Sequence, residues 1–192
     1  RSATELKSFI WERELNRGIE LEGKTVGIIG YGNTGAAFSQ KIESFGCRIL
    51  AYDKYKSGFG NNNIEECNIN TIYKECDIIS FHIPLTQETK YFFDKSFIEK
   101  MENPFYLINT SRGGVVSNSD LIKGLKTKKI LGCCLDVIEN ENPKFSAINI
   151  NKDFNYLLNC KNVIITPHIA GLSKEANKKL STLLVNKILE LK

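Results

Sequence analysis

Short apolar runs alternate with stretches of helical periodicity along most of the chain. Such runs are typical of strands buried on both faces of a sheet, and the amphipathic stretches between them are typical of helices that connect parallel strands. The pattern predicts strands at residues 25–29, 48–52, 78–81, 106–109, 130–137 and 163–165. It predicts helices at residues 34–45, 69–75, 95–101 and 119–126, the last after a capping-box spacing of Ser117 and Asp120. Repeated strand and helix units favour an α/β fold, a doubly wound parallel sheet in a three-layer αβα arrangement.

Two end segments do not belong to this alternation. Residues 3–15 carry a helical pattern before the first strand, and residues 174–191 carry another after the last strand. The second pattern has its apolar residues at helical spacing, namely Leu180, Leu183, Leu184, Ile188 and Leu191. We expect both segments to be helices that bridge the sheet to another part of a protein.

Charge and hydropathy narrow the classes of function. The chain of 192 residues has 26 Lys and Arg against 22 Asp and Glu, and its net charge of +4, with both signs interspersed, is too weak to predict nucleic-acid binding. No apolar run approaches the roughly 20 residues of a membrane span, and residues 1–14 show no secretory signal pattern. We therefore expect a cytoplasmic protein with neither a nucleic-acid nor a membrane partner.

The cysteines do not form a metal-binding or disulfide pattern. Six are present, none in a CxxC spacing, and neither of the two histidines, His82 and His168, has a cysteine partner in sequence. Reduced thiols are the default for such a chain in the cytoplasm. We expect no metal site.

The strongest local motif is the glycine loop Gly30–Gly35, with the sequence G-Y-G-N-T-G, between the first predicted strand and the first predicted helix. Gly30 suits a tight turn, Gly32 lets the backbone approach a pyrophosphate, and Gly35 lets the helix pack closely on the strand. The helix would then direct free N–H groups and the positive end of its dipole at the phosphates. The motif predicts a dinucleotide site, with a ligand-free glycine turn and a methyltransferase loop as alternatives.

An acidic residue makes this motif more specific. Asp53 follows the second predicted strand, 18 residues after Gly35, where a carboxylate can accept hydrogen bonds from the adenosine ribose hydroxyls. The same charge would repel the 2′-phosphate of NADP, so we predict NAD as the cofactor. Lys54 and Lys56 would weaken this preference by offering a cation to a phosphate.

Three further segments, residues 109–114, 136–141 and 166–171, follow later strands, where ligand groups usually lie in an open parallel sheet. They contain Arg112, Glu141 and His168. An arginine can hold a substrate carboxylate, a glutamate can orient a base, and a histidine can move a proton. This combination is the chemistry of hydride transfer to a 2-oxo acid.

With these motifs in order, and with Phe81-His82-Ile83-Pro84-Leu85-Thr86 between them, the sequence from Leu21 to Leu191 resembles the D-isomer-specific 2-hydroxyacid dehydrogenases. The resemblance implies a Rossmann-type NAD-binding domain of an oxidoreductase that interconverts D-2-hydroxy acids and 2-oxo acids. It implies a small-molecule 2-oxo or 2-hydroxy acid as substrate and a homodimer formed through the cofactor domains. It also implies a linker helix at residues 1–20, the cofactor domain at residues 21–172 and, at residues 173–192, a helix returning to a substrate domain outside this chain, without which we expect poor turnover.

The resemblance also implies roles for single residues. The substrate-binding arginine is Arg112, the carboxylate is Glu141 and the acid/base is His168. The implied cofactor-binding residues are Gly30, Gly32, Asn33, Thr34, Gly35, Asp53, His82, Pro84, Thr110, Ser111, Arg112, Asp136, His168 and Gly171. His82 is expected to contribute backbone and shape to the cofactor cleft rather than chemistry.

The sequence departs from the family pattern at two places. Asn142 separates Glu141 from Pro143, which leaves Glu139 as an alternative for the carboxylate, and Ser117 replaces an aspartate with another good helix N-cap. Three other functions remain open: an NAD-responsive corepressor with a dehydrogenase fold, a formate dehydrogenase, and a methyltransferase. The carboxylate of Glu141 disfavours a formate dehydrogenase, and a methyltransferase leaves Arg112 and His168 without a role.

Overall fold

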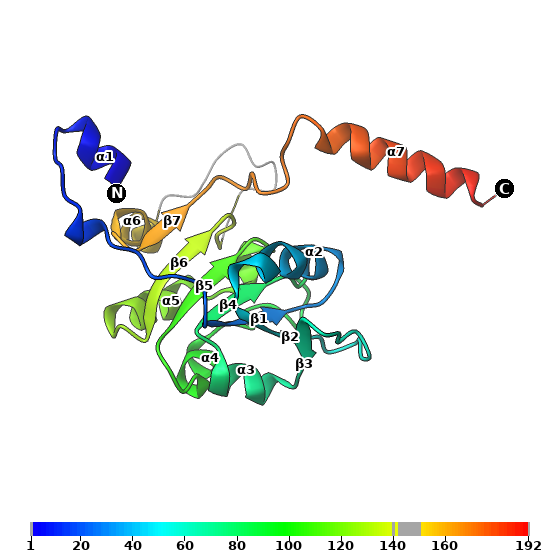
Figure 1. Cartoon of the computed structure of the whole chain (residues 1–192), viewed down its shortest axis with the longest axis horizontal. Coiled ribbons are helices and arrows are strands. Elements are labelled where there is room, and N and C mark those ends of the chain that lie inside the picture. Colours follow the sequence, from blue (N-terminus) through cyan, green and yellow to red (C-terminus); the bar gives the residue numbers. More distant parts are fainter. Residues whose placement is uncertain (1, 140, 142–150, 192) are drawn as a thin grey trace.

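One parallel sheet of seven strands forms the centre of the molecule (Figure 1). The computed structural model describes residues 2–139, 141 and 151–191. The strand order is β3-β2-β1-β4-β5-β6-β7, so the direction in which successive strands are added to the sheet reverses between β1 and β4. The strands are β1 (Thr25–Ile29), β2 (Arg48–Tyr52), β3 (Ile64–Glu66), β4 (Ile78–Phe81), β5 (Phe105–Asn109), β6 (Ile130–Leu135) and β7 (Val163–Ile165). The predicted doubly wound, Rossmann-type fold is confirmed, and its switch point lies beside β1.

Helices connect the strands and cover the sheet. α3 (Ile69–Glu75), α4 (Lys95–Lys100), α5 (Asn118–Lys126) and α6 (Lys152–Asn159) connect successive strands from β3 to β7 and contact one another in that order. α2 (Asn33–Ile42) connects β1 to β2. It lies on the face of the sheet opposite to α3–α6 (Figure 1). Right-handed crossovers require these opposite sides, because the two halves of the sheet are wound in opposite directions.

The core divides into two clusters, one on each face of the sheet. Alternate residues of β1 show the division, because Val26 and Ile28 pack with the cluster under α2, whereas Ile29 packs with the larger cluster on the other face. The larger cluster includes Phe81, Phe93 and the other aromatic side chains between β4 and α4. Both faces of the central strands are therefore buried, as the short apolar runs predict.

Most predicted elements are confirmed, but two predicted elements differ and two observed elements were not predicted. Residues 3–15 do not form one helix: α1 (Ser2–Lys7) ends early, Phe9 has a positive φ of 59°, and a short 3-10 turn follows at Glu14–Asn16. The apolar side chains of this segment are largely exposed, Trp11 at 78%, and short helices depend on packing for their stability. β3 and α6 were not predicted, and predicted strand 130–137 ends at Leu135.

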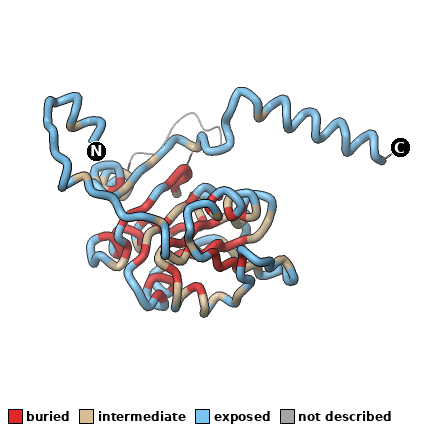
Figure 2. The backbone as a smooth tube through the Cα atoms, viewed as in Figure 1, coloured by how far each residue is buried: buried red, intermediate tan, exposed pale blue. Residues whose placement is uncertain are grey.

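The two ends of the chain are mostly exposed, whereas the strands at the centre are mostly buried (Figure 2). α7 (Ala176–Leu189) projects away from the sheet and has no buried residue, and its Leu180, Leu183 and Ile188 are each more than half exposed. The described helices include none with the length and hydrophobicity that a membrane crossing needs. All six cysteines are free thiols.

Candidate active site

The glycine loop has the geometry that its sequence predicts. Gly30 follows β1 with a φ of 95°, and a Cβ there would lie 2.7 Å from the carbonyl oxygen of His82. A Cβ on Gly35 would lie 2.1 Å from the carbonyl oxygen of Gly30, so the first turn of α2 packs directly on the loop. A Cβ on Gly32 would meet nothing within 4 Å, which leaves room for a ligand at the start of the helix. Asn33 and Thr34 form the exposed first turn of α2.

Asp53 lies at the end of β2, beside this loop. One carboxylate oxygen accepts a hydrogen bond from the Tyr31 N–H (2.8 Å), and the other accepts from the N–H groups of Tyr55 (2.9 Å) and Lys56 (3.0 Å). These bonds tie the end of β2 to the glycine loop and fix the position of the carboxylate. Each oxygen of a carboxylate can accept more than one hydrogen bond, so ribose hydroxyls can still bind here.

A cavity of about 480 Å³ connects these elements. Gly30, Gly32 and Asp53 line one side, and the loop after β4, including His82 and Pro84, lines the other. Its volume lies within the range of about 300–1,000 Å³ for small-molecule and cofactor sites. The glycine loop, the fixed carboxylate and this cavity together fit the adenosine and pyrophosphate part of a dinucleotide.

His82 contributes structure to the cavity wall. Its Nε2 lies 2.9 Å from the hydroxyl of Ser80, its ring contacts Phe38, and its backbone N–H donates to the carbonyl of Ile29. Burial lowers its pKa to about 4, so the ring is neutral near neutral pH. These contacts agree with the expectation that His82 supplies backbone and shape.

The loop after β5 is organised by Asn109, which is fully buried. Its side-chain oxygen accepts from the N–H (3.1 Å) and hydroxyl (2.8 Å) of Ser111, and its amide donates to the carbonyl of Arg112 (3.2 Å). Ser111 is therefore turned inward, whereas Thr110 and Arg112 are exposed at the carboxyl edge of the sheet. The Arg112 guanidinium donates to the Ser111 carbonyl at 2.7 Å.

The side chain of Asp136 holds the turn after β7 through hydrogen bonds. Its carboxylate, in a residue only 5% exposed, accepts from the Thr166 hydroxyl (2.6 Å) and from the N–H groups of Ile169 (2.9 Å) and Ala170 (2.8 Å). Burial opposes its negative charge, but these hydrogen bonds outweigh burial and lower the pKa of Asp136 below its ordinary value. Asp136 is thus an anchor of the turn that carries His168.

His168 and Glu141 form the most specific contact of the site. The Nδ1 of His168 lies 2.8 Å from a carboxylate oxygen of Glu141, and both side chains are partly buried, at 27% and 20% exposed. The backbone N–H of His168 donates to the carbonyl of Asp136, and its φ is 54°, a left-handed value that is uncommon outside glycine. The second Glu141 oxygen accepts from the Ile138 N–H. Two carboxylates thus hold one histidine and its turn.

The structure separates the two candidate glutamates. Glu139 accepts hydrogen bonds from the Tyr91 hydroxyl (2.5 Å) and from the Asn118 N–H at the start of α5 (3.1 Å). Glu141 is the one that contacts His168. Asn142 and Pro143 lie outside the described residues.

Strand order brings the predicted site residues to one edge of the sheet. Arg112 and His168 follow β5 and β7, with Asp136 after the intervening β6, and the glycine loop and Asp53 follow β1 and β2. Gly171 lies in the exposed turn after β7 and contacts nothing at its Cβ position. Asn109 begins the predicted segment 109–114, but no role was predicted for it, and its only signal was its place at the end of a strand. Among the described residues no cluster of side chains could hold a metal ion.

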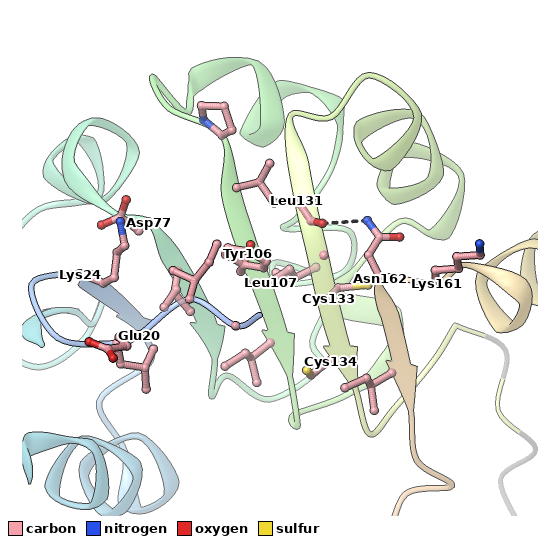
Figure 3. Close-up of a pocket in the computed structure, with 18 of the residues that line it drawn as sticks. Glu20, Lys24, Asp77, Tyr106, Leu107, Leu131, Cys133, Cys134, Lys161 and Asn162 are labelled. Atoms are coloured by element: carbon pink, nitrogen blue, oxygen red, sulfur yellow. Dashed lines mark hydrogen bonds between the residues drawn. The ribbon is translucent and has the colours of Figure 1, made fainter. Parts of the chain in front are cut away.

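A second cavity, of about 580 Å³, lies elsewhere. Figure 3 shows it on the sheet face opposite α3–α6, where Tyr106, Leu131 and Cys134 lie across β5 and β6. Asn162 donates to the Leu131 carbonyl at 2.7 Å within it. It is an apolar groove and carries none of the predicted site residues.

Comparisons with known proteins agree with this geometry. Residues 1–170 match the family described as D-isomer specific 2-hydroxyacid dehydrogenase, NAD binding domain. Hydroxypyruvate reductase of Thermotoga maritima is 36% identical over 188 residues, which are 98% of this chain and 59% of the relative. D-lactate dehydrogenase of Escherichia coli is 36% identical over 170 residues, 85% of this chain and 52% of the relative. The chain therefore spans a little over half the length of these relatives.

Solved structures give the same result. The NAD-complexed D-isomer specific 2-hydroxyacid dehydrogenase from Lactobacillus delbrueckii ssp. bulgaricus superposes with a TM-score of 0.84 at 27% identity, over 99% of this chain and 61% of that one. Salmonella D-lactate dehydrogenase gives 0.83 at 34% identity, over 98% of this chain and 59% of that one. The comparisons give no support to the corepressor alternative.

Proposed function

The chain belongs to the D-isomer specific 2-hydroxyacid dehydrogenases, as their NAD-binding domain, and we propose from this premise that it serves an enzyme acting on D-2-hydroxy acids and 2-oxo acids. NAD would supply the hydride acceptor and its reduced form the hydride donor. Gly30–Gly35 and Asp53 would hold its pyrophosphate and ribose, with His82 and Pro84 as the opposite wall of the cavity.

The positions of the polar groups support the proposed catalytic roles. Arg112 presents an exposed guanidinium whose planar fork can bind a substrate carboxylate through two parallel hydrogen bonds. The same positive charge stabilises negative charge that develops on the neighbouring carbonyl oxygen. His168 gives a proton to that oxygen during reduction and takes it back during oxidation. Glu141 holds the ring in the orientation for this transfer.

One observation carries the proposal: a partly buried histidine in a left-handed conformation, fixed at its ring by Glu141 and at its backbone by Asp136. A left-handed non-glycine residue costs of order 1–3 kcal/mol, and such strain is concentrated at functional sites. A histidine with only a structural role needs neither the strain nor two carboxylates.

The test is reduction of a panel of 2-oxo acids, including pyruvate, glyoxylate and hydroxypyruvate, by the natural full-length protein with NADH. We expect the D-configured product from pyruvate and from hydroxypyruvate, whose reduction creates a chiral centre, and a fall in kcat of about 10²–10⁴ for His168→Gln. Glu141→Gln should also lower kcat, whereas Glu139→Gln, which removes a carboxylate that contacts Tyr91 instead, should change it far less. An L-configured product, or equal rates in His168→Gln, contradicts the proposal.

We further propose a homodimer. Residues that line the apolar groove in Figure 3 are exposed, with Leu131 at 39%, Ile164 at 62% and Ile19 at 67%. Exposed apolar surface of this kind marks interaction sites, and a two-fold pair is the commonest way to cover one.

We also propose the domain division and the location. In this division residues 1–20 are the linker, residues 21–172 the cofactor domain and residues 173–192 a helix that packs on a substrate domain. The exposed leucines of α7 support the last assignment. Six unpaired cysteines support a cytoplasmic protein.

A further inference from the structure

Two loops meet over the adenosine end of the cofactor cavity. Lys54 and Tyr55 follow β2, and Glu88 lies in the loop after β4, so the two segments come from the strands on either side of β1. One carboxylate oxygen of Glu88 pairs with the Lys54 ammonium, and the other accepts from the Tyr55 hydroxyl. All three residues, together with Asp53, line the cavity.

The ammonium groups of Lys54 and Lys56 contact groups other than the Asp53 carboxylate. Lys54 pairs with Glu88 and also lies 5.6 Å from the Tyr55 ring centre. The Lys56 ammonium donates to the Tyr31 carbonyl at 3.2 Å. The Asp53 carboxylate is held by backbone N–H groups instead, so no side-chain cation among these contacts neutralises it.

This arrangement bears on the choice between NAD and NADP, which differ by a phosphate on the adenosine 2′-oxygen. A phosphate monoester carries a charge of about −1.5 to −2 near neutral pH and needs a cation to bind. Lys54 is the cation adjacent in sequence to Asp53, but Glu88 pairs with it, so Asp53, Lys54 and Glu88 together carry one net negative charge.

We propose that Glu88 is a second determinant of cofactor specificity: by engaging Lys54 and Tyr55 it withholds a cation from the 2′-phosphate position and adds a carboxylate near Asp53. This inference rests on the proposed function. The pair is a poor candidate for a stabilising contact, because Lys54 and Glu88 side chains are 57% and 42% exposed and pairs of this kind contribute little to folding. Its main effect is on the charge that a bound nucleotide meets.

The test is fluorescence titration with NADH and with NADPH, which gives the ratio of the two Kd values for each variant. Glu88→Gln keeps the size and the hydrogen-bonding capacity of the side chain but removes its charge. We expect the ratio of the NADPH Kd to the NADH Kd to fall about tenfold in this variant, more at low salt than at high salt. Adding Lys54→Met to Glu88→Gln should remove most of that gain.

The matched control is Glu99→Gln, which removes one carboxylate from an exposed ion pair with Lys95 on α4, outside the cofactor cavity. It should leave the ratio unchanged. An unchanged ratio in Glu88→Gln, with NADH still bound, overturns the inference alone. A gain that persists in full after Lys54→Met overturns the role assigned to Lys54, because the removal of a carboxylate alone then explains it. Failure of the folded wild type to bind either nucleotide overturns the proposed function and this inference with it.

Discussion

Asp136 shows how one buried side chain can organise the turn that carries a site residue. It is almost fully buried, accepts three hydrogen bonds from the turn after β7, and remains charged because those bonds outweigh the cost of burial. The same turn places His168 in its left-handed conformation next to Glu141. Asp136 is thus a positioning residue, and Glu141 orients the ring itself.

Replacing this anchor should loosen the turn. In Asp136→Asn the amide nitrogen would face a backbone N–H, leaving a buried donor unpaired at a cost of about 1–3 kcal/mol in the free energy of unfolding. Urea denaturation measures this loss. The variant should also lower kcat with a smaller change in the cofactor Kd, because it displaces His168 and not the glycine loop. A variant as stable and as active as the wild type would contradict this role.

His82 should make stability depend on pH. Its pKa in the folded protein is about 4, below the ordinary value of about 6.5, because burial disfavours the charged ring. The unfolded chain therefore takes up a proton first as the pH falls, and the stabilisation, fully present above about pH 6.5, is lost progressively toward pH 4, by up to about 3 kcal/mol.

The measurement for His82 compares the free energy of unfolding from pH 7 to pH 4 in the wild type and in His82→Gln. Carboxylates titrate in both proteins, so their contributions to the free energy of unfolding cancel when the two profiles are subtracted. The wild type should lose more stability over this range than the variant. Parallel profiles would show that His82 is not buried as a neutral ring.

At the scale of elements, β1, the glycine loop and α2 act as one unit. Two glycines in this unit should respond differently to the same substitution. In Gly35→Ala the new Cβ would lie 2.1 Å from the Gly30 carbonyl oxygen, so the helix must move away from the strand, at a cost of at least about 2 kcal/mol in stability.

Gly32→Ala is the matched variant. Its Cβ meets no protein atom within 4 Å and its φ is −84°, so the free energy of unfolding should change by less than about 1 kcal/mol. NADH affinity should nevertheless fall, because the methyl group occupies the space left for the pyrophosphate. Thermal melting and NADH titration of both variants separate packing from binding. Equal effects of the two substitutions on melting would refute the distinction.

The sequence predicts the central strands at the bounds that the structure shows, and it also predicts α7, which has no buried residue. β1, β2, β4 and α3 lie at the predicted residues, because their apolar runs and caps reflect burial in the core. Residues 3–15 have a helical pattern but no packing partner, and the helix ends at Lys7. α6 was missed although Asn151 caps it by accepting from the Phe154 N–H, a signal present in the sequence.

The candidate site was predictable where a role depends on a local motif. The glycine loop and Asp53 follow from spacing along one strand and helix, and the structure places them around one cavity. The choice between Glu139 and Glu141 depends on which carboxylate reaches His168, a contact 27 residues apart that no local pattern encodes. Asn109 was missed for the same reason, because its role is visible only in its bonds to Ser111 and Arg112.

At the scale of the whole molecule, the sheet is covered unevenly. α3–α6 lie over one face, whereas the apolar groove lies on the other face, toward β7, and remains exposed (Figure 3). Ile164→Lys would place a charge in this groove and should convert a dimer into monomers, as measured by sedimentation velocity. Leu158→Lys is the control, since Leu158 is similarly exposed, at 58%, but lies on α6. A wild-type monomer, or a dimer unaffected by Ile164→Lys, would contradict the proposed interface.

Binding of NAD by this chain would depend on the glycine loop and Asp53. The most direct measurement is a fluorescence titration of the chain with NADH, repeated with Asp53→Asn, which keeps the side chain's size but replaces a charged acceptor by an amide. We predict saturable NADH binding by the wild type and weaker NADH binding by the variant, in the absence of any substrate. A folded wild-type chain that binds no NADH, or a variant that binds it equally well, would contradict the account.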